Sequence, residues 1–105
     1  MQQFDVYANP SKHTRKAYPY ILDIQSDVLS DIATRIVVPL GLKKDFKSEQ
    51  LKKLTPAVEY EGQELLILIP QIASVPAKVL QEPIGSLSHL REEIVSALDF
   101  AITGI

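Results

Sequence analysis

Short segments in the first part of the chain alternate apolar and polar positions, the pattern typical of half-buried β-strands. Phe4 and Val6 alternate with more polar neighbours, and residues 9–11 then have the chemistry of a turn. A later apolar segment is rich in β-branched residues, and its Pro39 predicts that this strand ends there or lies at a sheet edge. The pattern predicts strands at residues 3–8, 18–24 and 35–40, with a solvated loop at residues 12–16.

A β-hairpin is predicted further along the chain. Val58 and Tyr60 precede a Glu61-Gly62 turn, and the nearly continuous apolar run 65–69 is typical of a buried return strand. Before the hairpin, the Lys-rich residues 41–54 predict a long exposed loop. After it, three prolines leave room for one more short strand at most, at residues 78–81.

The period changes near the end of the chain, where one apolar stripe predicts an amphipathic helix. Ser88 is the expected N-cap, and Gly104 is suited to a left-handed C-cap. The stripe consists of Leu90, Ile94, Ala97, Leu98 and Ala101, and further apolar side chains outside it are Val95, Phe100, Ile102 and Ile105. A helix that is apolar on more than one face is deeply buried or contacts a partner, so we expect self-association or a partner site at the tail.

Composition adds few constraints to this picture. The 105 residues are 46% hydrophobic and 23% charged, as expected of one globular domain spanning residues 1–105. Several short strands with no helix between them indicate a mainly β protein, a small antiparallel barrel or sandwich with a C-terminal helix. The absence of Cys, of a readable signal peptide and of a long apolar run leads us to expect a cytoplasmic protein that contacts no membrane.

The net charge of −2 is unevenly distributed along the chain. Residues 1–53 contain nine Lys and Arg against six Asp and Glu, whereas residues 54–105 contain two against seven. A nucleic-acid-binding protein of this size is usually distinctly basic, so direct binding of DNA or RNA would have to depend on a local patch.

The residues that could perform chemistry do not form a recognisable catalytic set. His13 and His89 are far apart, and neither has the sequence context of a nucleophilic triad. His13 with Arg15 could act as base and charge stabiliser in RNA cleavage, although a solvated basic loop is the simpler interpretation. Asp23, Asp27 and Asp31 lie in turn-rich sequence, and the glycines are isolated, so we expect no metal and no cofactor.

Several short motifs, which occur in the same order as in the family, resemble those of the CcdB family of toxins. They are "DIQSD" at residues 23–27, "VVPL" at 37–40, "ASVP" at 73–76, "LSH" at 87–89, the terminal "GI" and the opening "MQQFDVY". The resemblance implies a homodimer of an SH3-like antiparallel barrel with a small extra sheet and a C-terminal helix. It further implies the toxin of a type II toxin–antitoxin system that binds the A subunit of DNA gyrase and traps the gyrase–cleaved DNA complex, so that DNA replication is inhibited without catalysis by the toxin.

The resemblance also implies a set of functional residues and partners. Gyrase-binding residues carried over from the family are Val28, Leu29, Asp99, Ile102, Thr103, Gly104 and Ile105. The family's tail typically reads Trp-Gly-Ile, whereas this chain has Thr103 in the aromatic position, so Ile102 and Ile105 are expected to contribute more of the contact. The cognate antitoxin would neutralise the toxin, and the two together would bind operator DNA and autoregulate transcription.

The basic stretches are the expected contacts for an acidic, disordered antitoxin segment, because opposite charges speed encounter and set register. Their residues are Lys12, Arg15, Lys16, Lys43, Lys44 and Lys47. Two alternatives remain open at this stage. One is a ribosome-independent endoribonuclease on the same fold, as in toxins of the MazF and Kid type, and the other is an inert homologue that only binds its antitoxin.

Overall fold

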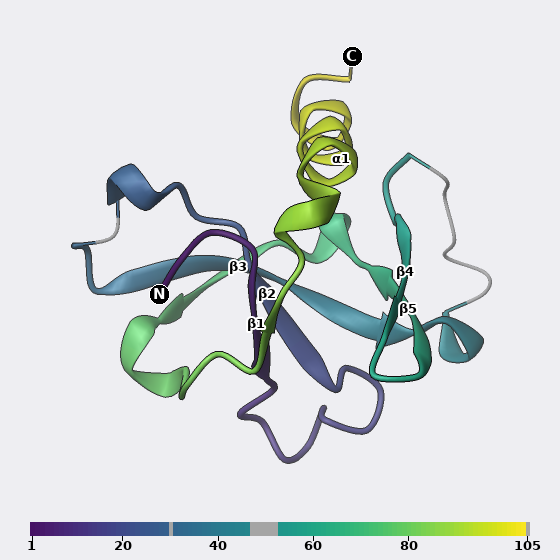
Figure 1. The fold of residues 1–105 in the computed structure, drawn as a ribbon, viewed down its shortest axis with the longest axis horizontal. Coiled ribbons are helices and arrows are strands. Elements are labelled where there is room, and N and C mark those ends of the chain that lie inside the picture. Colours follow the sequence, from purple (N-terminus) through teal and green to yellow (C-terminus); the bar gives the residue numbers. More distant parts are fainter. Residues whose placement is uncertain (30, 47–52, 105) are drawn as a thin grey trace.

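A curled antiparallel β-sheet and one C-terminal helix form the fold, and the helix packs against the sheet with its first turns and projects beyond it at the top of Figure 1. The computed structural model describes residues 1–29, 31–46 and 53–104. The strands are β1 (Asp5–Ala8), β2 (Tyr20–Asp23), β3 (Thr34–Leu42), β4 (Ala57–Tyr60), β5 (Gln63–Ile67), β6 (Ala73–Pro76) and β7 (Gly85–Ser86). Short 3₁₀ helices lie between them, and the α-helix is α1 (Arg91–Thr103). The predicted mainly β fold with a C-terminal helix is confirmed.

The long strand β3 organises the sheet, whose order is β4-β5-β3-β2-β1-β7. On one side β3 pairs with β2; on the other side its first half pairs with β6 and its last residues pair with β5. The hairpin of β4 and β5 together with the end of β3 is the small extra sheet, and β3 makes it continuous with the rest.

Pro39 neither ends β3 nor lies at an edge, so both predictions made from it are wrong. It pairs with Ile21 of β2, and its carbonyl oxygen accepts a hydrogen bond of 3.0 Å from the Leu68 N–H on the opposite side. The N and C=O of one residue point to the same side of a strand. The missing N–H of proline therefore faces the place where β3 changes its partner from β6 to β5, and no ladder bond is lost there.

The main hydrophobic core lies between the concave face of the sheet and α1. Alternate residues of the strands point into it, which follows from the period of two in a strand. Its buried members are Phe4, Val6, Leu22, Ile24, Val38, Leu40, Leu65, Ile67, Ile69, Leu87, Ile94 and Ala97. The intervening residues of the same strands form two smaller clusters on the other face, one around Tyr7 and one around Phe46.

The return strand β5 is buried on both faces, which explains its continuous apolar run. Leu65 and Ile67 point into the main core, whereas Leu66 and Leu68 point into the cluster around Phe46. A strand that is buried on both faces requires a continuous apolar sequence, and the predicted hairpin with its Glu61-Gly62 turn is confirmed.

The two edges of the sheet are joined by a side chain. The Tyr60 hydroxyl at the end of β4 donates a hydrogen bond of 3.2 Å to the Ile84 carbonyl, directly before β7. Its ring contacts that of Tyr20 edge-on, with 5.1 Å between centroids. A Cβ atom at Gly85 would collide with the Tyr60 hydroxyl oxygen, so the close approach of the two edges requires glycine at that position.

Two loop predictions were wrong in part. Residues 78–81 do not form a strand; residues Ala77–Val79 are a 3₁₀ helix, and the strand is β6 just before it. In the segment expected to be an exposed loop, Gly41 is a buried residue of β3 and Phe46 is only 8% exposed. Aromatic burial beneath the neighbouring loop, through a Tyr18–Phe46 ring contact at 5.2 Å, outweighs the charge of the adjacent lysines.

The helix begins later than predicted and is capped differently. Residues Ser88–Leu90 form a 3₁₀ turn, and Leu90 is the N-cap of α1 with no side-chain hydrogen bond, so Ser88 is not its cap. Ala101, expected in the core, is exposed because the helix extends past the edge of the sheet. The C-cap prediction is confirmed: Gly104 has φ 76°, and its N–H donates to the Phe100 carbonyl at 2.9 Å.

Candidate binding surfaces

Two exposed apolar residues mark the turn that follows β2. Residues Asp27–Leu29 form the 3₁₀ helix η1, in which Val28 is 91% exposed and Leu29 is 47% exposed. Nearby Ile32 is 48% exposed. Isolated exposed apolar side chains are common, but three of them within one short connection form a surface that favours contact with another protein.

The tip of α1 carries the second exposed apolar residue group. Ile102 is 73% exposed, and Asp99, Thr103 and Gly104 are also exposed. The Thr103 hydroxyl donates a hydrogen bond of 2.6 Å to the Asp99 carbonyl four residues earlier. The Thr103 hydroxyl is therefore bonded within its own helix, and Ile102 is the large exposed apolar side chain of the described tip. Ile105 lies outside the described residues.

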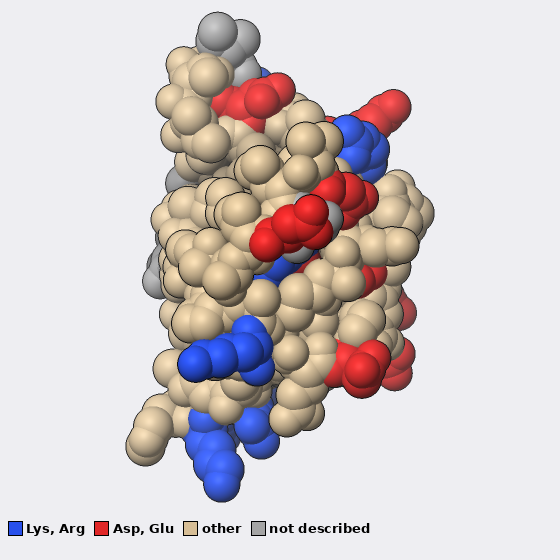
Figure 2. All heavy atoms as spheres, turned by 90° about the vertical axis from the view of Figure 1, so that its left-hand side faces the viewer, with Lys and Arg blue, Asp and Glu red and all other residues tan. Residues whose placement is uncertain are grey.

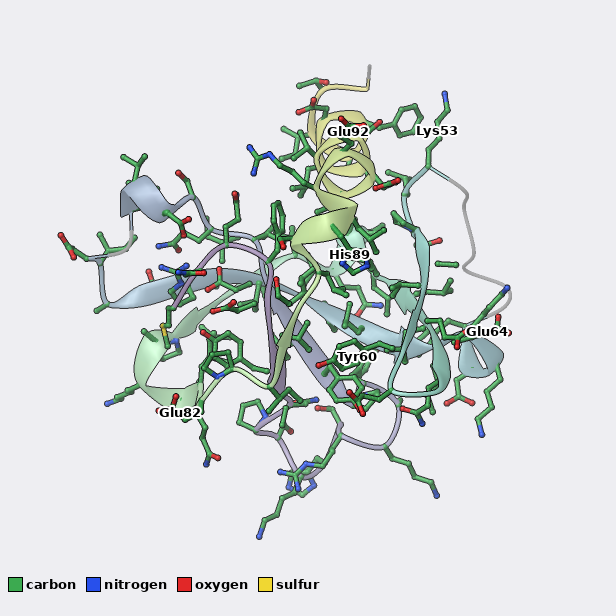
Figure 3. The ribbon with its side chains drawn as sticks, in the orientation of Figure 1. Lys53, Tyr60, Glu64, Glu82, His89 and Glu92 are labelled. Atoms are coloured by element: carbon green, nitrogen blue, oxygen red, sulfur yellow. The ribbon has the colours of Figure 1, made fainter. Side chains whose placement is uncertain are left out.

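The rest of the second apolar face of α1 is partly covered. Val95 packs against the main core, and Phe100 is half-buried with the Lys53 ammonium 5.4 Å from its ring centroid. Figure 3 shows Lys53 beside the end of α1. The apolar surface that this helix leaves open is thus concentrated at its tip, and not along a whole face.

A single chain does not bring the two apolar groups together. Figure 1 shows η1, the blue coil at the left, well separated from the tip of α1 at the top. The gyrase-binding residues inferred from the sequence therefore form two patches: Val28 and Leu29 on η1, and the described tail residues on α1.

The expected antitoxin-binding lysines lie in two stretches whose ends are adjacent. Lys12, Arg15 and Lys16 belong to the exposed loop between β1 and β2. The end of this loop contacts the other stretch, because the Leu42 N–H donates to the Ala17 carbonyl at 3.2 Å. Lys43 and Lys44 begin the next 3₁₀ helix, and Lys47 lies outside the described residues.

A groove of about 490 Å³ runs beside the second basic stretch, between it and the turn of the hairpin. Lys43 and Lys44 line one side and Glu64 lines the other, and the Lys43 ammonium lies 3.2 Å from the Glu64 carboxylate. Figure 2 shows a comparable segregation of charge: Lys and Arg gather at the lower end of the face shown, where the loop between β1 and β2 lies.

A buried ion pair was not anticipated from the sequence. Asp23, interpreted as a turn residue, is a fully buried member of β2, and the Arg35 Nε donates to its Oδ2 at 2.8 Å. Burial raises the pKa of the Asp23 carboxyl above its usual range, although the backbone N–H of Gln25 and the Arg35 guanidinium oppose that rise. No periodicity indicates such a pair, because its partners are separated by 12 positions in the sequence.

Side chains around η1 were also missed. The Gln3 N–H donates to Asp27 Oδ1 at 2.8 Å, and the Gln3 side chain connects the Ile24 carbonyl with the Arg91 guanidinium of α1. Gln25, only 1% exposed, bonds to the backbone on both sides of its carboxamide. Gln3, Ile24, Gln25 and Asp27 all lie in motifs that resemble the family, but nothing in those motifs indicates these hydrogen bonds or the burial of Gln25.

The residues weighed for catalysis are not assembled into one site. His13 is an exposed residue of the basic loop, and Arg15 directs its Nε to the Asn9 carbonyl at 3.2 Å. His89 is exposed in the turn before α1 (Figure 3). Within the described ranges, no three His, Asp or Glu side chains are grouped as metal ligands. In those same ranges, no helix has the length and apolarity required to cross a bilayer.

The fold and these surfaces define a small mainly β protein whose exposed apolar and basic patches suit contacts with other proteins. A family model for the CcdB protein matches residues 3–104, nearly the whole chain. The chain therefore belongs to the CcdB family, and it is a toxin of a toxin–antitoxin system.

Proposed function

We propose that this toxin binds the A subunit of DNA gyrase and traps the gyrase–cleaved DNA complex, without catalysing a reaction itself. The observation that supports this proposal best is the exposure of Val28, Leu29 and Ile102, which hold large apolar side chains in water at two sites. Such exposure costs free energy in the unbound protein, and this free energy is recovered when a partner covers the apolar surface. Asp99, Thr103, Gly104 and Ile105 complete the proposed gyrase-binding set.

The test is a cleavage assay with purified gyrase, supercoiled DNA and ATP. The wild-type protein is expected to produce linear DNA after denaturation of the trapped complex. Ile102→Asp should abolish trapping, since it places a charge in the proposed contact. Val79→Asp is the control, because it introduces the same charge at an apolar residue that is 39% exposed and lies elsewhere. Equal activity of both variants and the wild type would refute the tail contact.

Thr103 offers a gain-of-function test. Because the family's tail carries Trp at this position, Thr103→Trp should strengthen gyrase trapping by adding an aromatic contact next to Ile102. Thr103→Val, which removes only the hydroxyl bonded to Asp99, serves as the control for loss of that hydrogen bond. An unchanged trapping activity in Thr103→Trp would show that this position does not contact the target.

The same proposal includes a homodimer. In a single chain the η1 turn and the α1 tip lie apart. Two copies would carry two η1 turns and two α1 tips on one particle. Light scattering at micromolar concentration tests this directly: we expect twice the mass of the 11.7 kDa chain, and a monomer would contradict the proposal.

We further propose that the cognate antitoxin binds along the two basic stretches. Their ends are adjacent through the Leu42–Ala17 hydrogen bond, so one acidic peptide could follow both. Replacing Lys12, Lys16, Lys43 and Lys44 by Ala should slow antitoxin association and weaken its dependence on salt, whereas Lys78→Ala should not. An association rate and a salt dependence like those of the wild type would contradict this placement.

RNA cleavage is the competing outcome. If the protein degrades RNA in a plain ribosome-free assay and leaves gyrase unaffected, the endoribonuclease interpretation is correct and the gyrase proposal is wrong. If it does neither and still binds the antitoxin, it is an inert homologue.

A further inference from the structure

We propose that Gln25 is a positioning residue for the target-binding turn: its buried carboxamide fixes η1 against β3 and so holds Val28 and Leu29 in the orientation that the target recognises. This inference rests on the proposed function, because it assigns those two residues to the contact with gyrase. Gln25 itself is 1% exposed, so its side chain offers almost no surface for direct contact with the target.

The two ends of one carboxamide connect two elements. The Gln25 Nε2 donates a hydrogen bond of 2.7 Å to the Leu29 carbonyl at the end of η1. The Gln25 Oε1 accepts one of 2.9 Å from the Ile36 N–H of β3. Because both bonds are short and the Gln25 side chain that makes them is buried, this side chain acts as a rigid connection between the turn and the sheet.

The backbone of Gln25 is itself fixed. Its N–H donates to Asp23 Oδ1 at 2.9 Å, and the other oxygen of that carboxylate is bonded to Arg35. Asp23 and Arg35 are 0% exposed. These bonds thus fix the backbone from which the carboxamide projects toward η1.

Hydrophobic packing cannot replace this connection, since η1 has no buried residue. Three of its hydrogen bonds are local. The Leu29 N–H donates to the Ser26 carbonyl, the Val28 N–H donates to Ser26 Oγ, and the Ile32 N–H donates to the Leu29 carbonyl at 3.4 Å. Among the described residues, the hydrogen bonds that tie it to other elements are those of Gln25 and of the Gln3 N–H with Asp27. Without the hydrogen bonds to other elements, η1 would sample many orientations, and the cost of ordering it on binding would weaken the affinity for the target.

The test compares two amide-to-acid variants. Gln25→Glu keeps the acceptor for Ile36 and loses the donor to Leu29. Asn9→Asp is the matched control, because Asn9 is also buried, at 5% exposed. The variant keeps the acceptor for the Ser11 N–H and loses the donor to the Thr14 hydroxyl and the Tyr18 carbonyl. Asn9 holds the basic loop and makes none of the hydrogen bonds of η1.

Three readouts are taken on each variant well below its melting temperature: gyrase trapping, antitoxin binding, and amide hydrogen exchange by NMR. Gln25→Glu is expected to trap gyrase at least about tenfold more weakly, because one hydrogen bond is lost and the new carboxylate oxygen repels the Leu29 carbonyl oxygen, with antitoxin affinity unchanged. The Leu29 and Ile32 amides should exchange about tenfold faster, while amides of β5 keep their protection. Asn9→Asp should leave gyrase trapping and these two amides unaffected.

The outcomes separate the two proposals. Unchanged exchange at Leu29 and Ile32 in Gln25→Glu would overturn the positioning role, whatever the target is. Equal losses of gyrase trapping in both variants would also overturn it, because the effect would then follow general stability. If wild-type protein fails to trap gyrase while exchange at these amides responds as expected, the proposed function fails and the role of Gln25 in fixing η1 stands.

Discussion

Replacing Arg35 by Met tests whether the buried ion pair stabilises the sheet. The Arg35 Nε and Nη2 lie 2.8 Å and 2.7 Å from Asp23 Oδ2, and both side chains are 0% exposed. The pair joins β2 to β3, the strand on which both parts of the sheet depend. Met has a similar length and no charge, so the variant leaves the Asp23 carboxylate buried without its partner.

The expected loss is large relative to the stability of the whole protein. Removing one member of a buried pair costs about 3–5 kcal/mol, and a domain of this size unfolds with roughly 5–15 kcal/mol. At about 4 °C per kcal/mol, the melting temperature should fall by roughly 12 °C or more. In contrast, Glu64→Gln breaks the exposed pair with Lys43, whose side chains are 36% and 68% exposed, and should cost less than about 1 kcal/mol.

The loss should depend on pH in a defined direction. Burial already raises the pKa of the Asp23 carboxyl, and removing Arg35 takes away one of the interactions that lower it. A carboxyl whose pKa is raised on folding stabilises the protein below its unfolded pKa, and this stability is lost as the pH rises through the folded pKa. The difference between Arg35→Met and the wild type should therefore be greatest at neutral pH and shrink on acidification.

Guanidinium unfolding followed by circular dichroism, at one protein concentration and at pH 4.5 and pH 7 (the two values lying at about the unperturbed carboxyl pKa and well above it), measures these differences. The double variant Asp23→Leu with Arg35→Met removes both charges and should recover most of the stability. A loss below about 1 kcal/mol in Arg35→Met at pH 7 would refute the reasoning, as would a loss that grows at acid pH.

Three further changes test other parts of the structure. Gly85→Ala should cost about 1–3 kcal/mol in thermal unfolding, because its Cβ would displace the Tyr60 hydroxyl that joins the sheet edges; a neutral result would show that the edges can separate freely. Burial raises the pKa of Tyr7 to about 12, so stability should fall as the pH rises above 10, and Tyr7→Phe should remove this fall. At pH 7 the same variant should be more stable by about 1 kcal/mol in urea unfolding, since the buried hydroxyl has no partner among the described residues, and a loss would indicate a bonded water. Ile94→Ala, at a residue that is 0% exposed, should cost about 2–5 kcal/mol and expose the amides of α1 to hydrogen exchange, and protection equal to that of the wild type would contradict the packing of α1.

Local sequence patterns determined most of the elements. The alternation around Val6 and Leu22, the Glu61-Gly62 turn and the apolar stripe through Ile94 each depend on neighbours along the chain, and the structure has two strands, a turn and a helix there, with the strands and the helix shorter than predicted. Family motifs spread over the chain added the fold class and the toxin family, which the match over residues 3–104 supports. Gly104 was also predictable, because the end of a helix and its left-handed cap are local features.

Pairing between distant segments decided the rest. Pro39 is tolerated in the middle of the sheet because β3 changes partners beside it, and Asp23 is buried because Arg35 comes from another strand. The same holds for Gln25, whose carboxamide finds its partners only when the turn and β3 are brought together. The sequence by itself thus determined which residues are apolar, where turns occur and which family the chain resembles. Only the tertiary structure decided which polar side chains are buried and what they hold in place, because a side chain is buried or paired only by segments that folding brings beside it.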